Sequence, residues 1–273
     1  MRGSDRERVA ELTADVWDGH DYIDRVFDDW LSDPGAWFQA AEVEGELVGL
    51  QRLRPIAAEI VWYEGLRVAS THRRQGLARA MLTAAAAQAR GLGFKEIRLA
   101  TANPGAIELF RSAGFTLLVA PRLWRASRVE GDEPARMPAA ADAERIFRLV
   151  QEDPALAAYG GVVANGEWAL DLSAQLLGRL AEEGALRVVA GGRALAAVRE
   201  GWGGDSLWAY FVSGSGGALQ ELLLALRYEA DADGMKAVNL WAPDGHPAEE
   251  DFGATGYDSE AEPFRLSYFA LRL

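Results

Sequence analysis

The stretch of sequence that decides the fold is residues 64–82, EGLRVASTHRRQGLARAML. It begins as an apolar run typical of a strand, passes through a basic turn, and continues with apolar and alanine residues at helical spacing. A helix that starts here presents free backbone N–H groups and the positive end of its dipole. Gly76 and Ala78 let the backbone approach a ligand, and Arg73, Arg74 and Arg79 add charge. We therefore predict an anion site, best suited to a diphosphate.

Other phosphate-binding signatures fit this turn worse. The sequence has no Gly-x-x-x-x-Gly-Lys-Ser/Thr pattern, and the turn lacks the three glycines of a dinucleotide fingerprint. Nucleoside triphosphatase and Rossmann folds are therefore disfavoured. Taken alone, the turn is equally consistent with a solvated basic loop before an ordinary helix.

The segments around this turn predict alternating strands and helices. Two amphipathic helices open the chain, and three apolar strand patterns follow, at residues 36–43, 47–53 and 60–68. Glu44-Gly45-Glu46 joins the first two strands. The helix that follows the turn spans residues 76–90, with Gly91 just past its end.

A strand and a second helix complete this half. The strand is expected at residues 97–102, directly before Asn103. Asn103 as N-cap and Pro104 at the first helical position open the helix, which closes at Gly114.

The second half of the chain repeats this layout. Strand patterns occur at residues 186–190, 194–198 and 207–212, and a helix runs from Gly217 to Gly234. Gly91 precedes Pro104 by 13 residues, as Gly234 precedes Pro247. We interpret this as a duplication, with coincidence as the alternative. A charged run with Gly and Pro at residues 128–134 places the expected boundary between domains 1–130 and 131–273.

Composition excludes several classes of chemistry. The chain has no cysteine, which rules out disulfides, thiolate zinc sites and a cysteine nucleophile. Its three histidines are far apart, so we expect no metal site. A net charge of −13 argues against nucleic-acid binding and is compatible with an amine substrate. No apolar run approaches the roughly 20 residues that span a bilayer, and no signal sequence is apparent, so we expect a cytoplasmic protein without membrane contact.

The motifs resemble the GNAT N-acetyltransferase family. Arg73-x-x-Gly76-x-Ala78 matches the family's Arg/Gln-x-x-Gly-x-Gly/Ala signature, with Leu66-x-Val68 at the expected place upstream. Downstream, the helix motif Asn-x-x-Ala-x-x-Leu-Tyr-x-x-x-Gly-Phe is matched by Asn103, Ala106, Leu109, Phe110 and Gly114-Phe115. The resemblance covers roughly residues 6–128. It implies an α/β fold (α+β, mixed sheet): two tandem GNAT-like domains, each a central mixed β-sheet flanked by helices.

The resemblance also implies acetyl-coenzyme A as cosubstrate, with no metal. Leu66, Arg67 and Val68 would then bind the acyl and pantetheine part, a backbone N–H near Arg67 or Val68 holding the acetyl carbonyl. The diphosphate would lie on the turn and helix start: Arg73, Arg74, Gln75, Gly76, Leu77, Ala78 and Arg79. Asn103 and Phe110 would face the pantetheine, although each also fits a purely structural role, as helix cap and as core aromatic.

The second half departs from the family pattern at the corresponding turn. Ser213-Gly214-Ser215-Gly216-Gly217 stands there without an arginine. We therefore expect a degenerate second domain that holds coenzyme A poorly or not at all.

The implied reaction is direct transfer to an amine, which needs a base. Glu64 is the candidate, because it lies four residues before Val68 on the strand and a period of two puts both on one face. A surface Glu paired with an arginine is the alternative role. Glu59 and Tyr63 are poorer candidates, because the same period turns them to the opposite face. Phe110 replaces the family Tyr proposed to protonate the leaving thiolate, so water or another residue assists or the thiolate leaves unaided.

These inferences lead to one expected function and two alternatives. The expected function is acetyl-coenzyme A-dependent N-acetylation of a small-molecule primary amine by a monomer or homodimer. A protein or peptide N-acetyltransferase is the alternative among enzymes. A non-catalytic coenzyme A-binding or interaction module is the alternative from another class.

Overall fold

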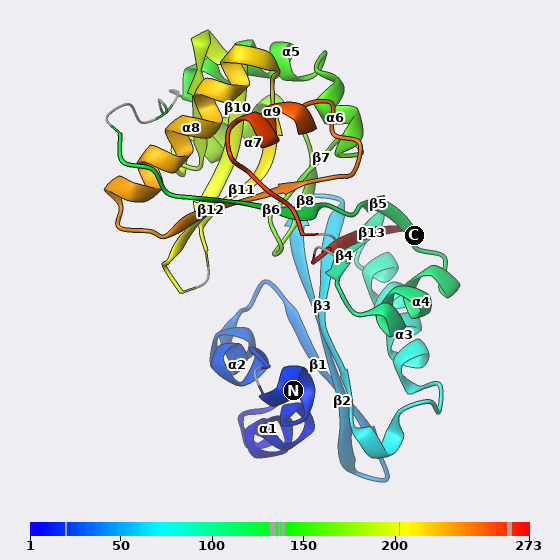
Figure 1. Cartoon of the computed structure of the whole chain (residues 1–273). Coiled ribbons are helices and arrows are strands. Elements are labelled where there is room, and N and C mark those ends of the chain that lie inside the picture. The colour runs from blue at the N-terminus through cyan, green and yellow to red at the C-terminus, as the bar shows by residue number, and fades with distance from the viewer. Residues whose placement is uncertain (20, 132–134, 136, 138–139, 202, 261–263) are drawn as a thin grey trace. The chain divides into compact units, whose positions relative to one another are not determined.

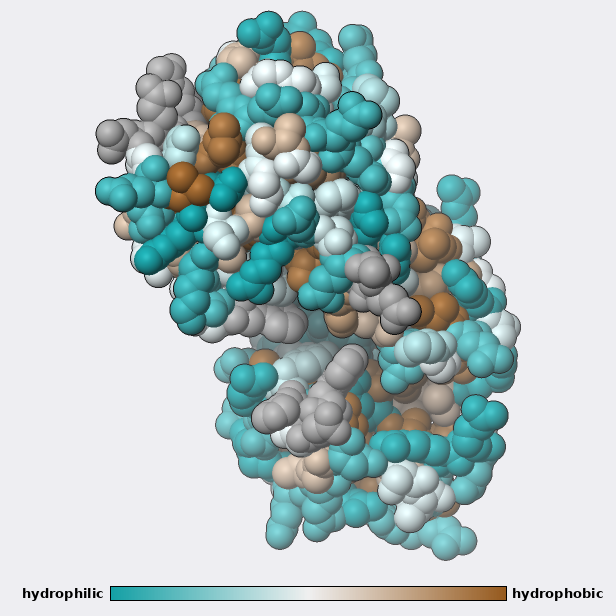
Figure 2. Space-filling model, in the orientation of Figure 1, coloured by the Kyte–Doolittle hydropathy of each residue, from teal (hydrophilic) through white to brown (hydrophobic). Residues whose placement is uncertain are grey.

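A computed structural model of the chain divides into two compact units. Unit 1 comprises Met1–Thr116 with Phe269–Leu273, and unit 2 comprises Leu117–Tyr268. The structure describes all residues except 20, 132–134, 136, 138–139, 202 and 261–263. In the described part of the chain, no helix is long and apolar enough to cross a membrane. Hydrophilic side chains cover most of the surface visible in Figure 2.

The first sheet, which lies mainly in unit 1, has six strands in the order β1-β2-β3-β4-β13-β5. Their bounds are β1 Trp37–Val43, β2 Glu46–Ala57, β3 Ile60–Val68, β4 Glu96–Thr101, β5 Thr116–Val119 and β13 Ser267–Arg272. β1, β2 and β3 pair antiparallel in succession, and β3 pairs parallel with β4. The sheet is therefore mixed, as expected, and the three predicted strands before the basic turn are confirmed.

Helices cover both faces of this sheet (Figure 1). On one face lie α1 (Arg6–Thr13) and α2 (Ile23–Ser32), and on the other lie α3 (Leu77–Gly91) and α4 (Pro104–Ser112). The first face buries an apolar cluster that includes Phe27, Trp30 and Leu50. The second buries another that includes Leu82, Phe110 and Ile97. Short 3₁₀ turns occur at Gly3–Asp5, Val16–Gly19 and Ser70–His72.

Turn residues account for the connections in unit 1. Glu44 and Gly45 have φ angles of 53° and 84°, as a two-residue hairpin turn with left-handed residues requires. The end of α3 differs from the expectation: Gly91 is its last helical residue, and Gly93, with φ of 90°, takes the left-handed position beyond it. The turn therefore uses the second of two nearby glycines.

The sheet of unit 2 has five strands in the order β6-β12-β11-β10-β9. The strands of unit 2 are β6 Arg122–Ser127, β9 Leu186–Val189, β10 Ala194–Glu200, β11 Ser206–Ser213 and β12 Ala237–Ala242, with the separate hairpin β7 Val162–Ala164 and β8 Ala169–Asp171. The helices are α5 Ala143–Val150, α6 Pro154–Ala158, α7 Ala174–Glu182, α8 Gly216–Ala232 and α9 Glu249–Ala254, with 3₁₀ turns at Ala140–Asp142 and Ala190–Gly192. An apolar cluster lies between the sheet and α8 and includes Leu219, Leu222 and Leu226.

The two sheets repeat one connection pattern. β2, β3, α3, β4 and α4 correspond in order and pairing to β10, β11, α8, β12 and α9: the first two strands of each set are antiparallel, and the second and third are parallel. The repeated layout predicted from the glycine spacing is therefore present in the fold.

The units do not divide at the expected position between residues 130 and 131. β6, which precedes that position, pairs with β12 in the second sheet, and β13, at the end of the chain, lies between β4 and β5 in the first. Each half of the sequence thus supplies one strand to the sheet of the other half. Local apolar patterns do not reveal such an exchange, because either sheet satisfies the hydrogen bonds of the strand.

Candidate functional site

The two central strands of unit 1 separate where the candidate site begins. β3 and β4 are paired only at Ile60↔Glu96, Val61↔Ile97 and Trp62↔Arg98, although β3 continues to Val68 and β4 to Thr101. Beyond Trp62 the backbone of β3 therefore presents one edge that β4 does not satisfy. Unpaired N–H and C=O groups next to an opening are available to an extended ligand.

A β-bulge changes which side chains of β3 share a face. Arg67 pairs with Leu50 and Glu64 pairs with Arg52, so between these pairs two residues of β3 oppose one residue of β2. Gly65 within the bulge has φ of 71°, a left-handed conformation that glycine adopts without strain. The extra residue reverses the alternation, so Glu64 shares a face with Arg67 and not with Val68. The face assignment from an uninterrupted period of two was wrong.

The later part of the basic turn between β3 and α3 leaves its backbone N–H groups without hydrogen-bond partners in the described part of the chain. Arg74 and Gly76 have φ angles of 63° and 84°. The N–H groups of His72 and Arg73 bond to carbonyls within the turn, and that of Ala80 bonds to Gly76. Among the described residues, none accepts a hydrogen bond from the N–H groups of residues 74–79. A Cβ placed on Gly76 would meet no atom within 4 Å, so the space before the helix is open.

The three arginines of the turn have different surroundings. Arg73 donates to the Val68 carbonyl at 3.0 Å and pairs with Asp15 at 3.2 Å, which braces the turn. Arg79 donates to the Ser112 hydroxyl at 2.7 Å and so links α3 to the end of α4. Arg74 is exposed and makes no hydrogen bond or ion pair within the described part of the chain. Arg74 is therefore the arginine whose charge is most available to an anion.

Three further predicted residues lie in or near the turn. Gln75 donates to the Thr71 carbonyl at 3.0 Å, which fixes the loop rather than the helix. Leu77 packs against the apolar cluster under α1 and α2. Ala78 begins the first turn of α3 with a side chain small enough to leave the backbone accessible.

Asn103 and Phe110 on α4 both have structural roles. The Asn103 Oδ1 atom accepts from the N–H groups of Gly105 and Ala106, at 2.9 and 3.2 Å, as the predicted helix cap. Its side-chain amide nitrogen remains available as a donor. Phe110 is 4% exposed and packs edge-on against Tyr63, with ring centroids 6.2 Å apart.

Glu64 belongs to a charged cluster on the α2 side of the sheet. Its Oε1 atom accepts from Arg52 at 2.5 Å and from Arg54 at 3.5 Å. Arg52 is almost fully buried, bonds Asp33 as well, and lies over the Trp30 ring at 4.9 Å. The ion pair with arginine, one of the two roles expected for Glu64, is therefore formed. Sequence reasoning missed Arg52 and Asp33; a charged residue inside the apolar pattern of residues 47–53 was the available signal.

Arg67 is held by a second ion pair on the same face. Its guanidinium binds both carboxylate oxygens of Asp21, at 2.6 and 3.2 Å, and lies over the ring of Tyr22. Burial raises the pKa of Tyr22 to about 12, so its hydroxyl is neutral near pH 7. We define Asp21, Tyr22, Trp30, Asp33, Arg52, Glu64 and Arg67 as the charged cluster.

Tyr63, a poorer candidate base, faces the opposite apolar cluster. Its hydroxyl donates to the Gln51 Oε1 atom at 3.0 Å, and burial raises the pKa of Tyr63 far above its ordinary value. It is therefore neither ionised nor exposed. Glu59 is exposed at the turn between β2 and β3, away from the charged cluster.

Histidines and carboxylates form no metal site in the described residues. His246 is buried in unit 2, where its Nδ1 atom accepts from the Ala248 N–H at 3.2 Å. Burial lowers the pKa of His246, which favours the neutral ring. His72 lies in the basic turn beside Thr71, and His20 lies outside the described residues.

The corresponding loop of unit 2 differs from the basic turn. It connects β11 to α8, and the N–H groups of Gly214 and Gly216 donate to the carboxylates of Asp153 and Asp251, at 2.5 and 2.8 Å. A pocket of about 690 Å³ lies beside this loop, lined in part by Glu152, Asp153 and Glu221. This pocket is not the site expected for a diphosphate, because carboxylates line it and already occupy two of the loop amides.

Comparison with known proteins supports the resemblance found in the sequence. Residues 6–115 match the profile of the acetyltransferase (GNAT) family. No curated protein matches the chain in sequence. Solved structures of the same fold include a GCN5-related N-acetyltransferase from Sphaerobacter thermophilus, which is 14% identical with a TM-score of 0.62 over 100% of this chain and 94% of that one.

Two further structures share the whole architecture. A tandem GNAT protein from the clavulanic acid biosynthesis pathway is 16% identical, with a TM-score of 0.54 over 97% of this chain and 93% of that one. The glucosamine N-acetyltransferase region of a fungal multi-domain β-N-acetylglucosaminidase is 11% identical, with a TM-score of 0.66 over 99% of this chain and 37% of that one. At these identities the likeness shows the fold, which is that of two GNAT-like domains in tandem.

Proposed function

We propose that this chain transfers the acetyl group of acetyl-coenzyme A to the primary amine of a small molecule, because residues 6–115 match the acetyltransferase (GNAT) family. The observation that carries the proposal is the row of unpartnered N–H groups at residues 74–79, at the start of α3 and beyond the point where β3 and β4 separate. The alternatives are transfer to a protein or peptide amine and coenzyme A binding without transfer.

The proposed cofactor site follows the splayed edge of β3. The backbone of Leu66, Arg67 and Val68 would bind the acyl and pantetheine part along that edge. The diphosphate would accept hydrogen bonds from the N–H groups at the start of α3, with Arg74 as the nearest free charge and Arg73 and Arg79 bracing the turn. The side-chain amide of Asn103 would donate to the pantetheine. The residues fit this ligand, because the backbone donors and the open space at Gly76 are already in place.

The proposed reaction forms one C–N bond and breaks one C–S bond. The neutral amine attacks the thioester carbonyl, and a backbone N–H of β3 stabilises the oxyanion. The thiolate leaves as the carbonyl reforms, and the attacking nitrogen loses one further proton to water. The amine must first lose a proton, and Glu64 is our candidate base, with water as the alternative. Arg52 and Arg54 hold its Oε1 atom, which leaves the Oε2 atom to accept the proton. Phe110 has no proton to donate, so solvent protonates the thiolate.

The charge of the whole chain, rather than the charged cluster, supports a small cationic acceptor, because Asp21, Asp33 and Glu64 are already ion-paired with arginines. A net charge of −13 favours the approach of a protonated amine. The fungal structure of the same fold is named for acetyl transfer to glucosamine, a small primary amine. These observations support a small molecule, while the protein acceptor remains the alternative that the experiment must exclude.

Release of free thiol from acetyl-coenzyme A tests the three functions together. Small primary amines, peptides with free N-termini and lysine peptides are supplied in separate reactions. We expect turnover with at least one small amine. Turnover only with peptides would reject the small-molecule acceptor, and tight binding of coenzyme A without turnover on any amine would reject both enzymatic functions.

A further inference from the structure

The loop between β11 and α8 has the backbone of an anion site. It follows a central strand and leads into the long helix α8, as the basic turn leads into α3. Gly214 and Gly216 have φ angles of 115° and 57°, so this loop, like the basic turn, contains residues in the left-handed region. A Cβ on Gly217 would meet no atom within 4 Å, which leaves the helix start accessible from the neighbouring pocket.

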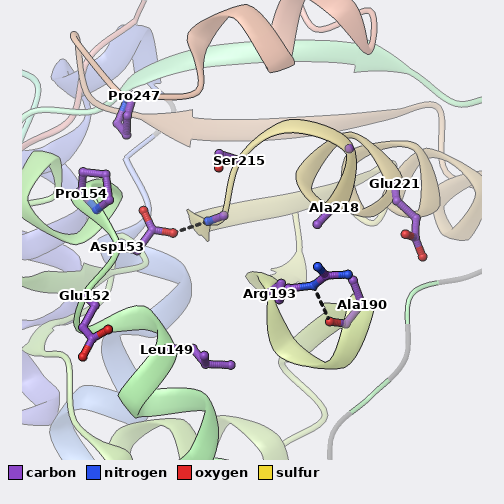
Figure 3. A pocket seen from close by; sticks show the side chains of 12 residues that line it. Leu149, Glu152, Asp153, Pro154, Ala190, Arg193, Ser215, Ala218, Glu221 and Pro247 are labelled. Carbon is purple, nitrogen blue, oxygen red and sulfur yellow. Dashed lines mark hydrogen bonds between the residues drawn. The ribbon is translucent and has the colours of Figure 1, made fainter.

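Two carboxylates from outside this loop accept hydrogen bonds from its backbone N–H groups. Asp153 begins α6, where its Oδ1 atom accepts from the Ala155 N–H at 2.8 Å. Its Oδ2 atom accepts from the Ser213 hydroxyl at 2.7 Å and from the Gly214 N–H (Figure 3). Asp251 on α9 accepts from the Gly216 N–H and, at 2.7 Å, from the side-chain amide of Gln220. Each carboxylate is thus anchored at both oxygens.

These carboxylates lie where a diphosphate would place its own charges. A carboxylate bound to backbone N–H groups at a helix start gains the same dipole and hydrogen-bond stabilisation as a phosphate oxygen. An incoming diphosphate would lose those donors and would meet two negative charges at close range. Glu152 and Glu221 line the adjoining pocket and add to the repulsion, whereas Arg193, the arginine of that lining, donates to the Ala190 carbonyl (Figure 3).

We propose that Asp153 and Asp251 act as built-in anions that keep the second loop closed to phosphates, so that the chain binds one coenzyme A and not two. The side chains of Asp153 and Asp251, and not the conformation of the loop backbone, exclude phosphates from this loop. The proposal rests on the proposed function only in assigning the single remaining site to the basic turn.

Calorimetric titration of the full chain with inorganic pyrophosphate and with coenzyme A tests the closure. We expect one site per chain in the unmodified protein and two in the Asp153→Ala, Asp251→Ala variant. Two sites in the unmodified protein would contradict the proposal, as would no gain of a site in the folded variant. A missing first site would reject the proposed function, whereas the gain of a site in the variant is counted separately and still decides the closure.

Two further variants make the result specific. Glu152→Gln, Glu221→Gln removes the same two charges from the pocket but frees no loop amide, and we expect no second site; a gain there would assign the exclusion to charge alone and overturn the role of the bonded carboxylates. If loss of the α6 cap prevents folding of the alanine variant, Asp153→Asn, Asp251→Asn keeps the cap acceptor while removing the charge. The folded asparagine variant must then gain the site, and its failure to do so contradicts the proposal.

Discussion

The basic turn after β3 and the loop after β11 share a backbone plan but differ in what their N–H groups contact. Both join a central strand to a long helix, and both use left-handed residues. In the basic turn the N–H groups of residues 74–79 have no partner among the described residues. In the second loop, Asp153 and Asp251 hold those of Gly214 and Gly216. A repeated fold therefore does not repeat a ligand site, because the side chains that reach the backbone decide what it can bind.

Among the substitutions proposed here, Glu64→Gln is expected to cause the largest loss of activity. If Glu64 removes the amine proton, kcat falls by roughly 10²- to 10⁴-fold, while coenzyme A affinity stays within about twofold. Steady-state rates across pH measure this loss, which higher pH partly restores because more amine is already neutral. Asp33→Asn is the matched control, since it also removes a partner of Arg52. Equal losses of kcat in both variants would mean that Glu64 only positions Arg52.

Gly65→Ala tests the bulge that distinguishes β3. A Cβ at Gly65 would lie 2.7 Å from the Trp30 ring, and φ is 71°. Left-handed strain of about 1–2 kcal/mol and overpacking of about 1–3 kcal/mol predict a loss near 3 kcal/mol in the free energy of unfolding by urea. Gly45→Ala has the same backbone penalty without a clash, so a loss of only about 1–2 kcal/mol is expected there. Equal losses would show that the ring does not constrain the bulge.

The Arg73→Ala, Arg74→Ala variant tests the charge that only the basic turn has. We expect the Kd for coenzyme A to rise about tenfold or more, because charge-assisted hydrogen bonds to phosphate contribute about 1.5–3 kcal/mol each. Calorimetry measures the affinity. Arg90→Ala, at the opposite end of α3, is the control and should leave the Kd unchanged. An unchanged Kd in the double variant would remove the turn from the cofactor site.

The smallest expected effect is the pH dependence of the stability of unit 2, through His246. Burial lowers the pKa of His246 below its model-peptide value of about 6.5, so the unfolded chain binds the proton more readily than the folded chain. Stability is therefore full above about pH 6.5 and declines as pH falls from there towards the folded pKa. Thermal unfolding at several pH values should show this decline reduced in His246→Gln. An identical pH dependence in both proteins would contradict the assignment.

The sequence predicted the elements better than the roles of their side chains. Periodicity and turn residues located β3 and the cap at Asn103, because those signals are local. The exchange of β6 and β13 is non-local, and neither strand pattern specifies its partner. The faces of β3 were misassigned because a bulge at Gly65 leaves the apolar pattern almost unchanged.

The candidate site was likewise predictable only in part. The free amides of the basic turn follow from its glycine and arginine pattern, whereas the carboxylates on the second loop come from α6 and α9, far away in sequence. Asp153 before Pro154 indicates a helix cap, but that pattern does not predict a hydrogen bond from the N–H group of Gly214.

The most direct test of the account is the backbone amide NMR spectrum of the isotope-labelled chain during titration with coenzyme A. If coenzyme A binds only at the basic turn, the amide signals of residues 74–79 shift in proportion to binding, while those of Gly214 and Gly216 stay in place because their carboxylate partners remain bound. Shifts at Gly214 and Gly216 without shifts at residues 74–79 would contradict the account.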